Sequence, residues 1–259
     1  MTALLATRHE PSAQSAPQRF TGPVGYGSVT PLDRQRHASH GVRLPHSYAW
    51  CSQTKAVPIN VEEFAVAALQ MPIAFVIDAT GRHDVAAVLA LHGDRNAFVD
   101  PDGRWLAEHY VPAYLRRFPF CSFVHGAAAQ TNAPIVCVQE AALEADSRTP
   151  LINGNGELTE YWKPWAQLID HFENGRAHTL RFISRLTDLD LLVPFDAVHM
   201  APDGRRHTLA GLYRVDEARL ATMTAGILRE MFQSGEMRAI YMHLLSLENL
   251  KQIRRADAP

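Results

Sequence analysis

The chain has 259 residues, of which 47% are apolar and 20% charged, with a formal net charge of −2 at pH 7. This length is ample for a hydrophobic core, and the composition is that of an ordinary globular protein. A nucleic-acid-binding domain would carry a basic excess, so the near-neutral charge argues against a nucleic acid partner. No apolar run approaches the ~20 residues of a bilayer-crossing helix, so we expect no membrane span.

The cysteines and the N-terminus bear on the compartment. The three cysteines form no CxxC pair, and so sparse and odd a count fits buried thiols in a reducing compartment better than a disulfide framework. The apolar "ALLA" of residues 3–6 is too short for a signal peptide. We therefore expect a cytoplasmic protein.

The first predicted segment is a disordered lead over residues 1–30, which are rich in Ser, Ala, Pro, Gly and Gln and poor in large aliphatic side chains. A single domain is expected over residues 31–255. Its first helix is predicted over 61–71, where apolar residues recur at helical spacing until Pro72. Strands are predicted next over three apolar segments: 72–78, 85–93 and 96–100, the last pairing with the second.

The remaining elements are a short helix or turn within 108–120, a strand over 133–140, and many helices in the second half. Two apolar helical stripes are predicted over 162–172 and 180–186, with Asn174–Gly175 as a weak point between them. Strands over 195–200 and 207–215 form a hairpin, and Asp216 caps a helix that closes near Gly235. A final helix covers 237–247. The expected class is α+β: a mixed or antiparallel sheet with hairpins, packed against helices concentrated in the C-terminal half.

The tetrapeptide "PDGR" occurs twice, at residues 101–104 and 202–205. A calcium loop of the EF-hand type with Gly103 at its sixth position would have Phe98 at the first and His109 at the twelfth, so two obligatory ligands are missing. Proline followed by Asp-Gly is what a tight turn requires. Both copies are therefore predicted to be hairpin corners.

Motifs of known chemistry are lacking. The thirteen histidines form no metal-ligand pattern, and neither a nucleophile elbow nor a phosphate-binding loop occurs. We therefore predict no catalytic residue, no metal site and no cofactor. The absence of a catalytic signature favours a binding protein over an enzyme.

A binding surface is predicted within residues 103–120, which contain five aromatic residues with Arg116 and Arg117 among them, a composition typical of binding hot spots. The residues assigned to it are Trp105, Tyr114, Arg116 and Arg117. The alternative is that the aromatic rings belong to the core and that the arginines are solvated or paired with Glu108.

The chain resembles the SapC family, a bacterial family named for a protein associated with surface-layer protein secretion. The resemblance starts at "PLDRQRHASHGVRL" (31–44) and is most specific in "NAFVDPDGRWLAEHYVPAYLRRFPF" (96–120). It continues through "VCVQE", "LINGNGEL", "AGLYRVDEARL" and "MHLLSLENLKQI", and spans roughly residues 31–252. Many relatives are similar to proteins encoded beside TonB-dependent receptors, flavin-dependent halogenases and cupin-like oxygenases.

The resemblance leaves two hypotheses. The first is a non-catalytic cytoplasmic accessory protein that binds a peptide or protein client, linked to surface-protein export or peptide modification. The second is an enzyme, or an enzyme's partner subunit, acting on peptides or aromatic amino-acid derivatives. A closed pocket with convergent polar side chains would support the enzyme, and a shallow groove edged by aromatic rings and arginines would support the binder.

Overall fold

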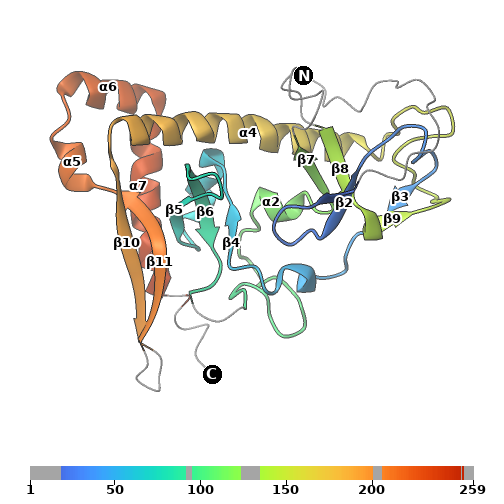
Figure 1. Ribbon diagram of the computed structural model, residues 1–259, viewed down its shortest axis with the longest axis horizontal. Coiled ribbons are helices and arrows are strands. Elements are labelled where there is room, and N and C mark those ends of the chain that lie inside the picture. Colours follow the sequence, from blue (N-terminus) through green and yellow to red (C-terminus); the bar gives the residue numbers. More distant parts are fainter. Residues whose placement is uncertain (1–18, 92–94, 124–134, 201–205, 252, 254–259) are drawn as a thin grey trace. The chain divides into compact units, whose positions relative to one another are not determined.

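A computed structural model describes residues 19–91, 95–123, 135–200, 206–251 and 253 (Figure 1). The chain divides into two compact units, each assembled from two separated segments. The first unit contains residues up to His46 and Leu115–Glu173, and the second contains Ser47–Tyr114 and the chain from Asn174 onward. Neither unit is one continuous stretch, so no linker in the sequence marks the division. For this reason the sequence predicted a single domain.

The first unit is built on a four-stranded antiparallel sheet in the order β1-β2-β8-β7. Its strands are β1 (Phe20–Thr21), β2 (Ser28–Pro31), β7 (Phe120–Phe123) and β8 (Ile135–Gln139). A two-stranded sheet joins β3 (Gly41–Val42) to β9 (Leu143–Glu144), which follows the 3-10 helix η3 (Glu140–Ala142). Phe120, Val136 and Val138 pack with Trp162 and Ile169 from the start of helix α4 (Lys163–Asp188) and from the turn before it.

The predicted disordered lead does not extend over residues 20–30. Residues 1–18 lie outside the described part, but Tyr26 and Val29 are fully buried and β2 pairs with β8. The Tyr26 hydroxyl donates to the carbonyl of Phe120 (3.0 Å), and the Gln139 side chain donates to the Tyr26 carbonyl (2.9 Å). Pairing with strands some 100 residues away, which composition does not reveal, orders this segment.

The second unit is built on a five-stranded antiparallel sheet in the order β10-β11-β5-β6-β4. Its strands are β4 (Ala56–Pro58), β5 (Ile73–Ile77), β6 (His83–Val88), β10 (Leu192–Met200) and β11 (Arg206–Val215). Its helices are η1 (Ala49–Cys51), η2 (Val61–Glu63), α1 (Phe64–Ala67), α5 (Glu217–Ala221), α6 (Ala225–Ser234), α7 (Glu236–Ser246) and η4 (Leu247–Asn249). One of the sequence boundaries between the two units falls within α2 (Ala113–Arg116). The α+β class and the concentration of helices in the C-terminal half are thus confirmed.

Helix α7 is fixed to the five-stranded sheet by the buried His243. Its Nδ1–H donates to the carbonyl of Ile73 on β5 (2.8 Å), and its Nε2 accepts from the backbone N–H of Val215 on β11 (3.2 Å). Burial lowers the pKa of His243 to about 4, so the ring is neutral at pH 7 and can donate to one strand and accept from the other.

The prediction of one helix from Asp216 to Gly235 was wrong in part, because Thr224 starts a new helix after α5.

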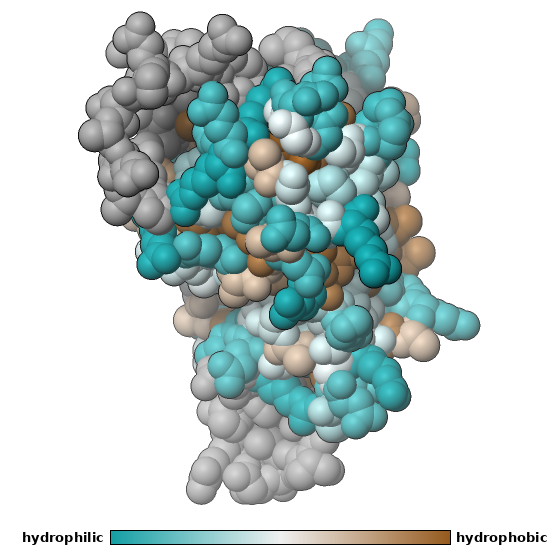
Figure 2. Space-filling model, turned by 90° about the vertical axis from the view of Figure 1, so that its right-hand side faces the viewer, coloured by the Kyte–Doolittle hydropathy of each residue, from teal (hydrophilic) through white to brown (hydrophobic). Residues whose placement is uncertain are grey.

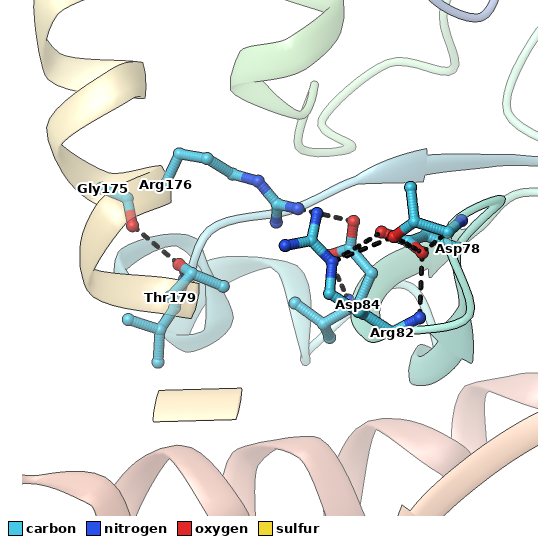
Figure 3. Close-up of polar contacts among 9 residues, drawn as sticks. Asp78, Arg82, Asp84, Gly175, Arg176 and Thr179 are labelled. Carbon is cyan, nitrogen blue, oxygen red and sulfur yellow. Dashed lines mark hydrogen bonds and ion pairs between the residues drawn. The ribbon is translucent and has the colours of Figure 1, made fainter. Parts of the chain in front are cut away.

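Helix α4 runs through Gly175 without a break, so the predicted weak point is absent. A Cβ atom at Gly175 would lie 2.9 Å from both Asn60 Nδ2 and Glu62 Oε2, and glycine therefore allows η2 to approach α4 closely. The adjacent Arg176 donates a hydrogen bond to Asp84 at the start of β6 (2.5 Å), which links α4 to the sheet (Figure 3). Glycine thus leaves room for the Asn60 and Glu62 side chains, at a helical cost of ~1 kcal/mol relative to alanine.

Candidate functional site

The first PDGR copy is a hairpin corner, as predicted. The Gly103 N–H donates to the Asp100 carbonyl (2.9 Å), and the Asp100 N–H donates to the Arg104 carbonyl (2.9 Å). Asp100 Oδ1 accepts from the Arg104 N–H (2.8 Å), while Gly103 takes a φ of 79° that favours glycine. The second copy, residues 202–205, lies outside the described part; the flanking strands pair from Leu192↔Val215 to Met200↔Arg206.

The segment before this corner is not the strand that its apolar residues predicted. Asn96 Oδ1 accepts from the Phe98 N–H (2.9 Å), which turns the chain. Among the described residues, the backbone contact with the end of the preceding strand is the hydrogen bond from the Ala97 N–H to the Leu89 carbonyl (2.8 Å). An asparagine side chain that satisfies the local backbone competes with a strand ladder, and here it prevails.

Two sets of hydrogen bonds hold the corner against the 3-10 helix η1. At one end, the Tyr48 N–H donates to the Gly103 carbonyl (2.7 Å). At the other, Asn96 donates its backbone N–H to the Ser52 carbonyl (2.7 Å) and its side-chain amide to the Cys51 carbonyl (3.3 Å). Segments that lie over 40 residues apart in the sequence therefore run side by side.

An open pocket of about 550 Å³ lies between these two segments. We call it the turn pocket; its lining residues are Ala49, Ser52, Gln53, Arg95, Asp100, Pro101, Asp102 and Gly103. Its charged groups are one guanidinium and two carboxylates. Its volume lies within the ~300–1,000 Å³ of ordinary ligand sites.

Trp105 lies directly behind the corner and is half-buried. Its ring stacks on Phe98 with centroids 5.6 Å apart and contacts Tyr48 at 5.4 Å. The indole Nε1 is buried and has no hydrogen-bond partner among the residues that the structure describes. Trp105 thus supports both the corner and the start of η1, which form the two sides of the turn pocket.

The other residues of the predicted binding surface lie in different environments. Tyr114 is 2% exposed, whereas Arg116 is exposed. Arg117 is 4% exposed and donates to Glu173 (3.2 Å), so it is not the solvated arginine of the alternative. A binding role for these four residues stays a prediction.

Sequence reasoning missed Arg95, Ser52 and Gln53. No motif surrounds them, and only the contact between two distant segments brings them to one pocket. Cys51 lies behind them and its thiol donates to the Tyr48 carbonyl (3.2 Å). Burial raises the pKa of Cys51 to about 12, so it does not supply a thiolate to the turn pocket at neutral pH.

The described residues contain no group of three or more His, Cys, Asp and Glu side chains placed to hold a metal ion. The turn pocket can instead offer charge pairing and hydrogen bonds to a bound molecule. Figure 2 shows one face of the molecule, on which hydrophilic residues predominate and hydrophobic residues are visible between them.

Within the described part of the chain, none of the helices is both long and apolar enough to cross a bilayer. The fold and the turn pocket together define an α+β protein of two antiparallel-sheet units with an open pocket lined in part by charged residues. The chain belongs to the SapC family, whose model matches residues 32–253, in agreement with the resemblance of its motifs. No curated protein matches the chain. No solved structure matches it either.

Proposed function

We propose that this SapC family member is a cytoplasmic accessory protein that binds a peptide or protein client through the turn pocket. The observation that carries the proposal is the open form of this pocket, whose lining offers charged, amide and hydroxyl side chains from two segments of the chain. Such a surface suits a segment of polypeptide better than a small substrate that has to be enclosed.

Trp105 belongs to this proposal as the ring that stabilises the back of the pocket. The aromatic cluster of Trp105, Phe98 and Tyr48 fixes the corner before any client arrives. A preformed surface loses less conformational entropy on binding, which raises affinity. The link to surface-protein export or peptide modification rests on the family resemblance alone.

The test is selection of displayed random peptides on the purified protein, followed by affinity measurement of the enriched peptides. Gln53→Trp fills the turn pocket from an exposed position, and Gln233→Trp adds the same ring to exposed α6 as a matched control. We expect peptides that bind the wild type and Gln233→Trp equally and bind Gln53→Trp at least about tenfold more weakly. Failure to enrich any peptide, or equal binding to both variants, would refute the proposal.

A further inference from the structure

We infer that the turn pocket selects a peptide segment carrying a cationic and an anionic side chain two residues apart. This inference rests on the proposed function and specifies the chemistry of the client. It comes from the placement of the charged groups at opposite ends of the pocket.

The positive end is Arg95. Its side chain is exposed and lines the pocket, and no described residue forms a hydrogen bond or an ion pair with it. The adjacent Asn96 is bonded to Ser52, which places Arg95 beside the C-terminal end of η1. A guanidinium presents a planar set of donors that matches a carboxylate, so this end suits an aspartate or glutamate side chain.

The negative end is the corner itself. Asp100 and Asp102 both line the pocket, and they lie beside the N-terminal end of η1 because Gly103 is bonded to Tyr48. Asp102 is 72% exposed, and its contact with Arg104 at 3.5 Å is a solvated one. An exposed pair of this kind contributes little free energy, so Asp102 can exchange Arg104 for a lysine or arginine of the client.

The separation of the two ends sets the spacing in the client. From Tyr48 to Ser52 the chain advances four residues through η1, which at ~2.0 Å per residue amounts to about 8 Å. Side chains at positions i and i+2 of an extended peptide share one face and lie about 6.6–6.8 Å apart at their bases. Adjacent residues would point to opposite faces. A lysine and an aspartate separated by one residue therefore fit both ends at once.

The experiment uses short, end-capped fluorescent peptides that contain Lys-Ser-Asp, with Gln and Asn replacing the charged residues singly and together, and an adjacent Lys-Asp peptide as the spacing control. Fluorescence anisotropy measures their dissociation constants for the wild type, Arg95→Ala and Asp102→Asn. Arg229→Ala and Asp188→Asn serve as matched controls, because these residues are exposed and lie outside the pocket.

We expect Lys-Ser-Asp to bind the wild type about tenfold or more tightly than its doubly neutral analogue and the adjacent-charge peptide. Arg95→Ala should abolish the preference for Asp over Asn and keep the preference for Lys over Gln. Asp102→Asn should abolish the preference for Lys over Gln and keep the preference for Asp over Asn. If the selected peptides need the pocket but all the synthetic peptides bind alike or not at all, the charge inference is wrong and the proposed function stands. If neither selected nor synthetic peptides bind, both are wrong.

Discussion

The guanidinium carbon of Arg117 lies 4.1 Å from the centroid of the Phe172 ring. The same side chain is 5% exposed and donates to Glu173, which also accepts a hydrogen bond from the Ser122 hydroxyl. A cation over an aromatic face is attracted to the ring, and removal of one partner of a buried ion pair is destabilising. Arg117 therefore connects β7 and helix α4 within the first unit.

We predict that Arg117→Ala lowers the free energy of unfolding by about 2–3 kcal/mol, because it removes a buried cation from its partners. Arg116→Ala should change it by no more than about 0.5 kcal/mol, since Arg116 is exposed. Urea unfolding followed by circular dichroism measures both. Equal stability of the two variants would contradict a structural role for Arg117.

Glu63 provides a second test, within the other unit. One of its carboxylate oxygens accepts from the Asn60 N–H (3.0 Å), and the other accepts from the Tyr110 hydroxyl (2.8 Å) and the Ala113 N–H (2.7 Å). Glu63→Gln turns one acceptor into a donor that faces another donor, so we expect a loss of about 2–3 kcal/mol. Tyr110→Phe, which removes the hydrogen bond to Glu63, should cost about 1 kcal/mol. A fully stable Glu63→Gln protein in urea unfolding would refute this account.

The buried histidines predict a pH dependence of stability. Burial is the main cause that lowers the pKa of both His243 and His37 to about 4, against an ordinary value of 6.5. As the pH falls from 6.5 to 4 the unfolded chain takes up protons that the folded chain does not, so stability is full above 6.5 and declines across this window. Each histidine contributes at most about 3 kcal/mol.

Urea unfolding at pH values between 7.5 and 4 measures this decline in stability. The range includes the ordinary histidine pKa of 6.5 and the pKa of about 4 in the folded protein. His243→Gln should be less stable at pH 7 but should show a shallower decline, because the substituted side chain does not titrate. An unchanged slope in both His243→Gln and His37→Gln would show that other groups control the acid response.

The three cysteines should react slowly in the folded protein. Cys51, Cys121 and Cys137 are buried, and burial raises the pKa of each to about 12, so the thiolate fraction near pH 8 is very small. We expect a chromogenic disulfide reagent to modify less than one thiol per chain in buffer and all three in denaturant. Rapid native reaction of any one of them would show that its strand or turn opens readily.

Gly103 offers a test of the corner that forms the turn pocket. Its φ of 79° disfavours other residues, and an added Cβ would lie 3.0 Å from the Cβ of Ala49. Gly81 has a φ of 81° but has no atom within 4 Å of such a Cβ. We expect Gly81→Ala to cost about 1 kcal/mol and Gly103→Ala about 2–3 kcal/mol, with loss of peptide binding only in the latter. Thermal unfolding and the peptide assay measure these effects, and equal costs would contradict close packing at Gly103.

Several elements could be predicted from residues that are neighbours in the chain. The apolar runs at β5, β6 and β8, the Asp216 cap and the left-handed Gly235 each express a local preference that the structure realises. The first PDGR corner is of the same kind, because proline, aspartate and glycine satisfy a tight turn by themselves. The α+β class and the family motifs follow from such local signals.

Other features depend on contacts between distant segments. Tyr26 is fixed by the hydrogen bond from its hydroxyl to the Phe120 carbonyl, and Gly175 leaves room for the side chains of Asn60 and Glu62. The turn pocket exists because Asn96 and Gly103 bond to the segment around η1. Local sequence fixes the periodicity and the turns, since these depend on the backbone preferences of adjacent residues. The burial of a side chain and the composition of a pocket were decided only by the tertiary structure, since they depend on long-range contacts that no local pattern specifies.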